Sequence, residues 1–252
     1  MVQFTFFGRV LPEVRRISIP RVVEFDYSEP NGTVTHFEIN IAAARIFARA
    51  SSTSEEASIS FDNATVRALE FCNTLVDLIA FQTGWALSVV LDVGLLEAEM
   101  RPLVLSERSV AKFCTVFNDE TSYSDVISAV LPNLPLRMAL NDLNASVSRL
   151  NYSAIACFRA VESIRHAISE STHSRSEAWQ KLRDILRIEK DFLDPIAEAS
   201  IGPRHGDRGK VEGDSQLEVT RRAWIIVDRY LKYLMRGGSE PLPEDEFPLL
   251  SA

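Results

Sequence analysis

The chain has 252 residues, of which 46% are hydrophobic and 25% are charged, which is typical of a globular protein and excludes disorder over most of its length. This length allows one large domain or two of ordinary size. The formal net charge of -8 argues against a protein that coats DNA non-specifically, because such binding depends on many Lys and Arg contacts with phosphate, but it leaves room for one local basic pocket.

The first part of the chain is dominated by β patterns. Alternation of apolar and polar residues, together with β-branched content, predicts strands between Phe4 and about Ala50. Residues 21–41 are expected to form a β-hairpin, because Asn31-Gly32 in its middle is a strong turn signal.

A helix and a further strand follow this β-rich stretch. Asp62 or Asn63 is expected to cap a helix that runs to about Thr83 with apolar residues at helical spacing. After Gly84, residues 85–93 are expected to be a buried strand. Residues 1–120 are therefore predicted to form an N-terminal mixed α/β domain that is rich in strands.

From about Ser122 the apolar period becomes helical, which predicts a helical domain over residues 121–238. A continuous apolar stripe covers residues 152–169. A helix is expected to begin near Ser174 and to break or bend near Pro195, and the last helix is expected to end at Gly237-Gly238. Residues 239–252 are acidic and rich in proline, and we expect them to be a loosely attached tail. The predicted fold class is α+β.

The main candidate site is the loop predicted at residues 201–214, which holds four of the chain's 10 glycines and the pair Arg204-His205. A guanidinium is always charged and binds phosphate, and an imidazole titrates near neutral pH. The pair is therefore suited to move a proton beside a bound phosphate. Arg208 and Lys210 extend it to a phosphate-sized basic patch.

Three segments of the second half resemble the HEPN superfamily. Residues 158–164 resemble its Arg-Ala-x-Glu helix segment, His205-Gly206 resembles its His-Gly ending, and residues 223–230 resemble its apolar closing helix. The resemblance covers about residues 122–237 and implies a helical bundle. Catalytic members are metal-independent ribonucleases that act as dimers. Their catalytic motif is an arginine followed, after four to six intervening residues, by a histidine. Here Arg204 directly precedes His205.

The resemblance implies roles for individual residues. His205 would accept the 2′-hydroxyl proton of RNA, Arg204 would stabilise charge on the phosphate, and the pair of Arg159 and Glu162 would orient the loop. Structural alternatives stay open: Arg204 caps a helix end or pairs with Glu162, His205 packs on Trp224, and Arg159 and Glu162 form a solvated ion pair.

Metal, cofactor and partner expectations complete the sequence interpretation. The three cysteines lack zinc-ligand spacing, so we expect no metal and no cofactor. The N-terminus lacks a secretory signal, which predicts a cytoplasmic protein without membrane contact. The resemblance implies a homodimer through the helical domain, RNA as substrate and a protein partner for the N-terminal domain. The alternative function is a catalytically inactive, dimerising interaction protein.

Overall fold

The computed structural model describes residues 2–29, 32–52, 59–105, 109–117, 123–149, 152–169, 174–206 and 213–251. The chain divides into two compact units, one formed by residues 1–108 and 148–150 and the other by residues 109–147 and 151–252. We call them the sheet domain and the helical domain. The predicted α+β class, a β-rich domain followed by a helical one, is confirmed.

The sheet domain is built on a six-stranded antiparallel sheet with strand order β2-β3-β4-β1-β5-β6. β2 and β3 pair from Val23↔Ile39 to Ser28↔Val34, which confirms the predicted hairpin; Asn31 in its turn lies outside the described residues. The strands are β1 (Val2–Leu11), β2 (Val23–Ser28), β3 (Val34–Ala42), β4 (Arg45–Ser52), β5 (Ser88–Leu96) and β6 (Arg101–Val104).

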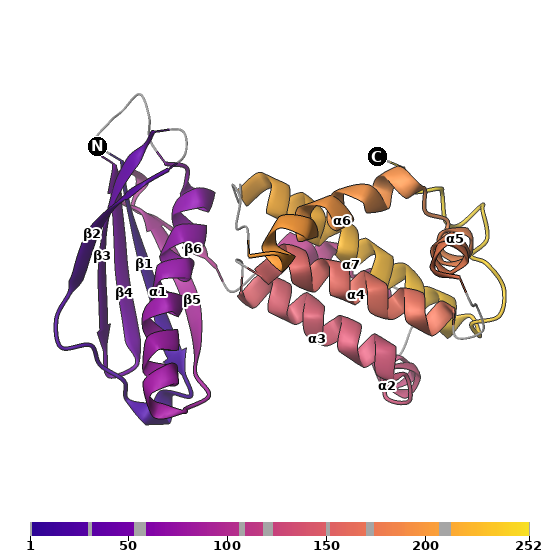
Figure 1. Cartoon of the computed structure of the whole chain (residues 1–252), viewed down its shortest axis with the longest axis horizontal. Helices are drawn as coiled ribbons and strands as arrows, with labels where there is room; N and C mark the ends of the chain where they lie inside the picture. The colour runs from indigo at the N-terminus through magenta and orange to yellow at the C-terminus, as the bar shows by residue number, and fades with distance from the viewer. Residues whose placement is uncertain are drawn as a thin grey trace. The chain divides into compact units, whose positions relative to one another are not determined.

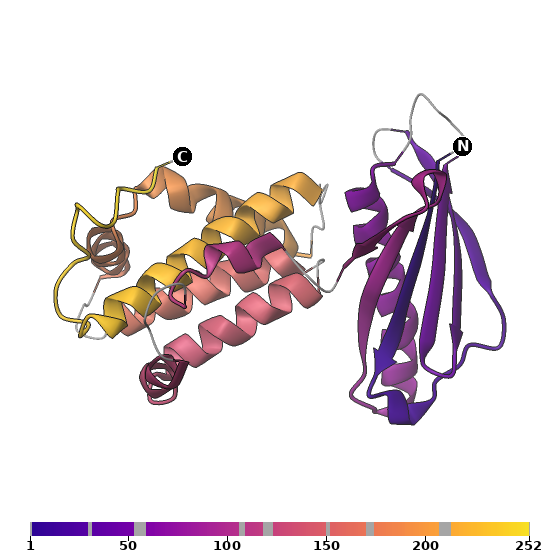
Figure 2. The ribbon, with the colours of Figure 1, turned by 180° about the vertical axis from the view of Figure 1, so that it is seen from behind.

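One face of the sheet is covered by the helix α1 (Phe61–Thr83), which lies in front of the strands in Figure 1. Alternate side chains of the strands point to this face, where Phe6 and Phe37 are fully buried. Phe61, the first residue of α1, packs on this face, since its ring centre lies 5.9 Å from that of Phe6 and its ring meets the Phe4 ring edge-on at 5.5 Å. Figure 2 shows the opposite face of the sheet, over which no described helix of this domain lies.

The ends of α1 are set by local chemistry. Ser60 is the N-cap, because its side chain accepts a hydrogen bond from the Asn63 N–H at 3.2 Å. The expectation that Asp62 or Asn63 caps the helix was therefore wrong. Gly84 ends α1 in the left-handed conformation with φ 69°, which confirms the predicted end. β5 begins at Ser88, three residues later than predicted, and Trp85 instead lies under the Arg15 guanidinium at 4.5 Å.

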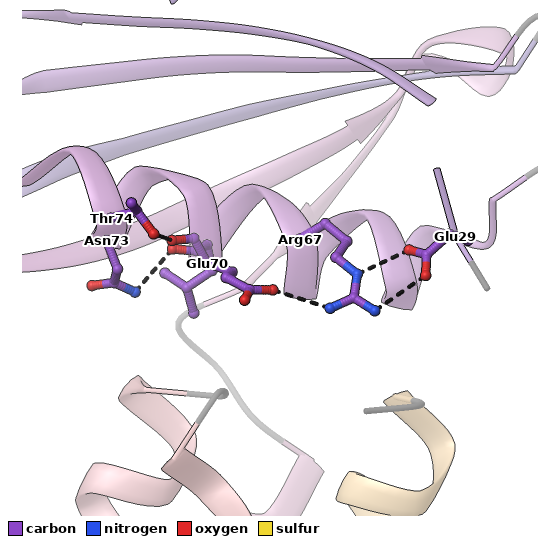
Figure 3. A network of polar contacts seen from close by, with 6 residues as sticks. Glu29, Arg67, Glu70, Asn73 and Thr74 are labelled. Atoms are coloured by element: carbon purple, nitrogen blue, oxygen red, sulfur yellow. Dashed lines mark hydrogen bonds and ion pairs between the residues drawn. The ribbon is translucent and has the colours of Figure 1, made fainter. Parts of the chain in front are cut away.

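A charged cluster ties α1 to the end of β2. The Arg67 guanidinium donates to both carboxylate oxygens of Glu29, at 2.9 and 3.1 Å, and to Glu70 at 3.0 Å (Figure 3). It also lies 5.2 Å from the centre of the Tyr27 ring. The two carboxylates compensate the charge of this guanidinium within the domain, and Arg67 and Glu29 are each only 12% exposed.

The helical domain has α4 at its centre, in contact with α5, α6 and α7 (Figure 1). The apolar stripe that predicted a buried helix face is buried, with Cys157, Val161 and Ile164 at most 1% exposed. The helices are α2 (Tyr123–Val130), α3 (Leu134–Ser148), α4 (Ser153–Ile168), α5 (Arg175–Leu186), α6 (Lys190–Arg204) and α7 (Gly213–Met235).

The helical domain begins near Ser109, not at residue 121 as expected. The segment before α2 is held by Asp228 of α7, whose carboxylate accepts hydrogen bonds from the main-chain N–H groups of Thr115 (2.6 Å) and Val116 (2.8 Å). Val116 is 3% exposed and belongs to the core of this domain. A short irregular segment has no apolar period, so the pattern gave no sign of this attachment.

The predicted break at Pro195 is also wrong, because α5 ends at Arg187 in the left-handed conformation (φ 53°) and Pro195 lies inside α6. Proline has no N–H, so the Asp191 carbonyl four residues earlier loses its helical donor. Arg222 of α7 donates to that carbonyl at 3.2 Å and to the Phe192 carbonyl at 3.1 Å. A side chain from another helix thus allows α6 to continue through Pro195.

The C-terminal segment packs against the helical domain, which corrects the expectation of a loosely attached tail. Leu242 is 3% exposed, and its N–H donates to the Ile185 carbonyl at 2.9 Å. Leu250 forms a parallel β-bridge with Ile188. Main-chain hydrogen bonds and one buried leucine hold this segment despite its acidic, proline-rich composition.

Within the described ranges, no helix is both long enough and apolar enough to cross a membrane.

Candidate functional site

Arg204 and His205 lie at the C-terminal end of α6. Arg204 is the last residue of the helix, and Gly202 and Pro203 are also helical, so the loop begins later than the predicted residue 201. The His205 N–H donates to the Gly202 carbonyl at 2.9 Å, and Gly206 turns the chain away with φ 80°. Residues 207–212, which include Arg208 and Lys210, lie outside the described residues.

The Arg204 side chain folds back over α4 and α6. Its guanidinium lies 4.4 Å from the centre of the Phe158 ring, and its Nε donates to the Ser200 carbonyl at 3.1 Å. Arg204 thus contacts one of the last carbonyls of its helix, as the capping alternative expected, and does not pair with Glu162. His205 is exposed, and among the described residues its ring has no hydrogen-bond partner.

Arg159 and Glu162 do not pair with each other, which corrects the sequence expectation. Arg159 Nη2 lies 3.4 Å from Asp142 of α3, whereas Glu162 accepts a hydrogen bond from Arg175 of α5 at 3.2 Å. Three-residue spacing brings two side chains near one helix face, but neighbouring helices offer closer partners. Burial raises the pKa of the Asp142 carboxyl, and Arg159 opposes this rise.

A cavity of about 500 Å³ lies between α4, α5 and α6, and we call it the α4–α6 pocket. Arg204 is one of its lining residues. Its other lining residues include the aromatic Phe158 and Trp179, the apolar Val161, Leu193, Ile196, Ala197 and Ile201, and the basic Arg175, Arg183 and Lys190.

Two neighbouring aromatic rings in the lining of the α4–α6 pocket are flanked by a cation on each side. The Arg165 guanidinium lies 5.2 Å from the Trp179 ring centre, the Trp179 and Phe158 rings are 6.4 Å apart, and Arg204 covers Phe158. Arg165 is only 7% exposed, and this burial lowers the pKa of its guanidinium. The Arg165 side chain also makes a polar contact with His166, between Nη2 and Nε2 at 2.9 Å.

The cations that line the α4–α6 pocket are only partly neutralised. Arg175 is paired with Glu162, and Lys190 lies 4.0 Å from Asp194. Within the described ranges, Arg183 and Arg204 have no carboxylate at ion-pair distance; Arg183 instead donates to the Gln180 side chain. Asp194 is the one acidic residue among the lining residues. The pocket therefore presents excess positive charge beside an aromatic and apolar surface, which suits an anion attached to a flat or apolar group.

A second, larger cavity of about 790 Å³ lies beside it and has the opposite balance of charge. It shares Arg183, Lys190 and Asp194 with the α4–α6 pocket. Its acidic lining residues outnumber its basic ones, namely Asp184, Glu189, Asp191, Asp194 and Glu244 against Arg183, Arg187 and Lys190. This cavity is less suited to an anion.

Sequence reasoning missed Trp179 and the cations around it. Arg175, Trp179 and Arg183 follow each other at four-residue steps, so they lie along one face of α5, and that spacing was a usable signal. No sequence spacing indicated that Lys190 lines the pocket, because it lies on the next helix, α6. Across the described residues, no group of three His, Cys, Asp or Glu side chains is placed to hold a metal ion.

The fold and the pocket define a two-domain α+β protein whose helical domain contains a cationic, aromatic cavity. Residues 4–102 match the family model described as Domain of unknown function (DUF8168) N-terminal domain, and residues 124–235 match the one described as the C-terminal domain of the same family. The two matches together span most of the chain, which therefore belongs to this family. No curated protein and no solved structure matches the chain.

Proposed function

We propose that this protein binds RNA through its helical domain, in keeping with the resemblance of residues 122–237 to the HEPN superfamily. The observation that carries the proposal is the α4–α6 pocket, in which Arg204 lies beside Phe158 and Trp179 with further cations around them. RNA combines flat bases with phosphates. Proteins hold single strands by stacking bases on aromatic rings and by pairing phosphates with Lys and Arg.

The overall acidity of the chain shapes this proposal. A net charge of -8 disfavours binding spread over the whole surface, so the affinity must come from a local set of cations. Arg183 and Arg204 are suited to this because no described carboxylate neutralises them.

The test is binding of fluorescently labelled single-stranded RNA to the full chain, followed by anisotropy. Replacing Arg183 and Arg204 together by Gln should weaken binding at least about tenfold, because each Arg–phosphate contact contributes about 1 kcal/mol or more. Arg49→Gln in the sheet domain is the matched control, since Arg49 lies within 3.3 Å of Glu38 and 3.8 Å of Glu97. Equal affinity of wild type and the double variant would exclude this site.

Cleavage of the bound RNA is a separate part of the proposal. His205 is exposed and directly follows Arg204, so an imidazole and a guanidinium are available at the same helix end. A neutral imidazole would take the 2′-hydroxyl proton as the 2′-oxygen attacks the phosphorus, and the guanidinium would stabilise charge on the phosphate. The bond from phosphorus to the 5′-oxygen would break, and the leaving 5′-oxygen would take a proton from water. The protein should then cleave RNA in the presence of a metal chelator, and His205→Ala should abolish cleavage while leaving binding intact. Intact RNA after incubation with wild type would reject cleavage and leave binding alone.

A different observation favours the second candidate function, a dimerising interaction protein without catalysis. Apolar side chains along α2, the turn after it and the start of α3 are exposed to solvent and together form an apolar patch. They are Tyr123 (68% exposed), Ile127 (40%), Leu131 (63%), Leu134 (55%) and Met138 (46%). Sedimentation velocity tests this role: a dimer that Leu131→Asp converts to a monomer would support it, and a monomeric wild type at micromolar concentration would exclude it.

A further inference from the structure

We propose that the α4–α6 pocket takes the terminal nucleotide of single-stranded RNA and selects ends that carry a phosphate monoester. This inference rests on the proposed RNA binding and names the part of the RNA that this site accepts.

The size and lining of the pocket indicate a single nucleotide and not a continuous strand. A volume of about 500 Å³ lies in the range of small-molecule sites. A site for a passing strand needs a groove whose cations follow the backbone. Here the accessible apolar surface comes from Ile201, which is 51% exposed, and from the half-buried Trp179 and Ala197. A flat base fits against this surface.

The arrangement of the cations indicates where the phosphate lies. Lys190 is the first residue of α6 and Arg204 the last, and Arg175 and Arg183 stand two turns apart on α5. The four cations therefore approach one cavity from two helices. The Arg175 side chain is 69% exposed and that of Lys190 76%, so these charged groups lie at the solvent edge. The phosphate is thus held at the rim, outside the apolar surface that receives the base.

The charge balance favours a monoester over an internal diester. A phosphate monoester carries a charge of about -1.5 to -2 at neutral pH, whereas a diester within a strand carries about -1. Arg175 and Lys190 already have carboxylate neighbours, but Arg183 and Arg204 have none among the described residues. The excess positive charge of the lining attracts a dianion more strongly than a monoanion, and a guanidinium can donate two parallel hydrogen bonds to it.

The experiment compares four RNA oligonucleotides of one sequence with the full-length protein by competition anisotropy. They carry a 5′-phosphate, a 3′-phosphate, no terminal phosphate, or no ends at all because they are circular. We expect one phosphorylated form to bind about tenfold more tightly than the unphosphorylated form, as charge-assisted hydrogen bonds to the terminal group require. Circular RNA should bind no better than the unphosphorylated form.

Substitutions in the pocket then test whether its arginines cause the preference for a terminal phosphate. In the Arg183→Gln/Arg204→Gln variant the preference for the phosphorylated end should fall to about onefold. Arg49→Gln, which alters a cation of the sheet domain outside the pocket lining, should keep the preference. Equal binding of circular and phosphorylated linear RNA would overturn the inference while leaving RNA binding in place. Absence of binding to all four would instead reject the proposed function.

Discussion

The two domains hold their arginines in different ways. In the sheet domain two arginines lie between carboxylates: Arg67 between Glu29 and Glu70 (Figure 3), and Arg49 between Glu38 and Glu97. In the helical domain several buried or pocket arginines meet carbonyl oxygens and aromatic rings instead. Arg229, for example, donates to three carbonyls, and Arg204 meets a carbonyl and the Phe158 ring.

This difference decides where positive charge remains. A carboxylate cancels the charge of a guanidinium. A carbonyl only accepts hydrogen bonds from its N–H groups, and an aromatic ring only packs on its face, so both leave the positive charge in place. The effect is visible at Arg229, where burial lowers the pKa of the guanidinium to about 10, with Arg187 as a second cause. The helical domain can therefore present a cationic pocket even though the chain as a whole is acidic.

The largest expected effect comes from removing a carbonyl-bound arginine. Arg229 is 7% exposed and donates to the carbonyls of Leu186 (2.8 Å), Arg187 (2.9 Å) and Pro248 (2.6 Å). Arg229→Met should destabilise the helical domain by about 4 kcal/mol, because three carbonyls lose their donor in or near the interior. Urea unfolding followed by tryptophan fluorescence measures this in a Trp85→Phe background, where the signal comes only from Trp179 and Trp224.

The matched control is Arg236→Met, since Arg236 is exposed and pairs with the exposed Glu246 of the C-terminal segment. It should leave the unfolding midpoint almost unchanged. In addition, Arg229→Met should speed hydrogen exchange around Leu250, because the C-terminal segment loses a main attachment. If Arg229→Met unfolds at the wild-type midpoint, the three carbonyl contacts do not stabilise the domain.

A smaller effect is expected for the neutralised arginine of the sheet domain. Arg67→Met removes the guanidinium that pairs with Glu29 and Glu70, whose side chains are 12% and 22% exposed. We expect a loss of about 2 kcal/mol, less than for Arg229 because both carboxylates still reach water. Hydrogen exchange of the β2–β3 amides reports this loss in the sheet domain alone.

A second substitution at the Arg67 cluster separates the contribution of its charge from that of its packing. In the Arg67→Met background, Glu29→Gln should recover part of the lost stability, because it removes one uncompensated charge. In the wild-type background, Glu29→Gln should instead destabilise the domain. Additive losses in the double variant would show that Arg67 acts through its packing on Tyr27 and not through the two carboxylates.

Local patterns predicted much of the fold. The alternation that predicted the β2–β3 hairpin and the apolar stripe of α4 depend on neighbouring residues only, and both were confirmed. The wrong predictions concern segments whose conformation depends on a residue that is distant in the sequence. Pro195 continues a helix because Arg222 supplies the missing donor, and the C-terminal segment is held because Arg229 and Ile188 contact it.

The candidate site was predicted less completely, for the same reason. Sequence reasoning selected Arg204 as a phosphate ligand, and the structure places it in a cationic pocket. Its position over Phe158 depends on the packing of α6 against α4, which no local pattern encodes. The pairing of Arg159 with Glu162 failed because Asp142 and Arg175 approach from other helices.

The smallest expected effect concerns Glu218, a carboxylate of the helical domain that does hold arginines. Hydrogen bonds from Arg221 lower the pKa of Glu218 to about 2; burial opposes this shift and Arg222 adds to it. A lowered carboxyl pKa contributes stability that is present above its ordinary value of 4.5 and is lost as the pH falls towards 2. Because the Glu218 side chain is 39% exposed, solvent screening reduces this contribution to about 0.5–1 kcal/mol.

The measurement is the difference in urea midpoint between wild type and Glu218→Gln as a function of pH. This difference should be largest above pH 4.5 and should shrink as the pH falls towards 2, where both side chains are neutral. A difference that stays constant over this range would mean that Glu218 stabilises α7 through neutral hydrogen bonds. In that case the ion pairs of Glu218 with its arginines would contribute little to the stability of the helical domain. The difference between the two domains in how they compensate arginine charge would then depend on buried groups alone.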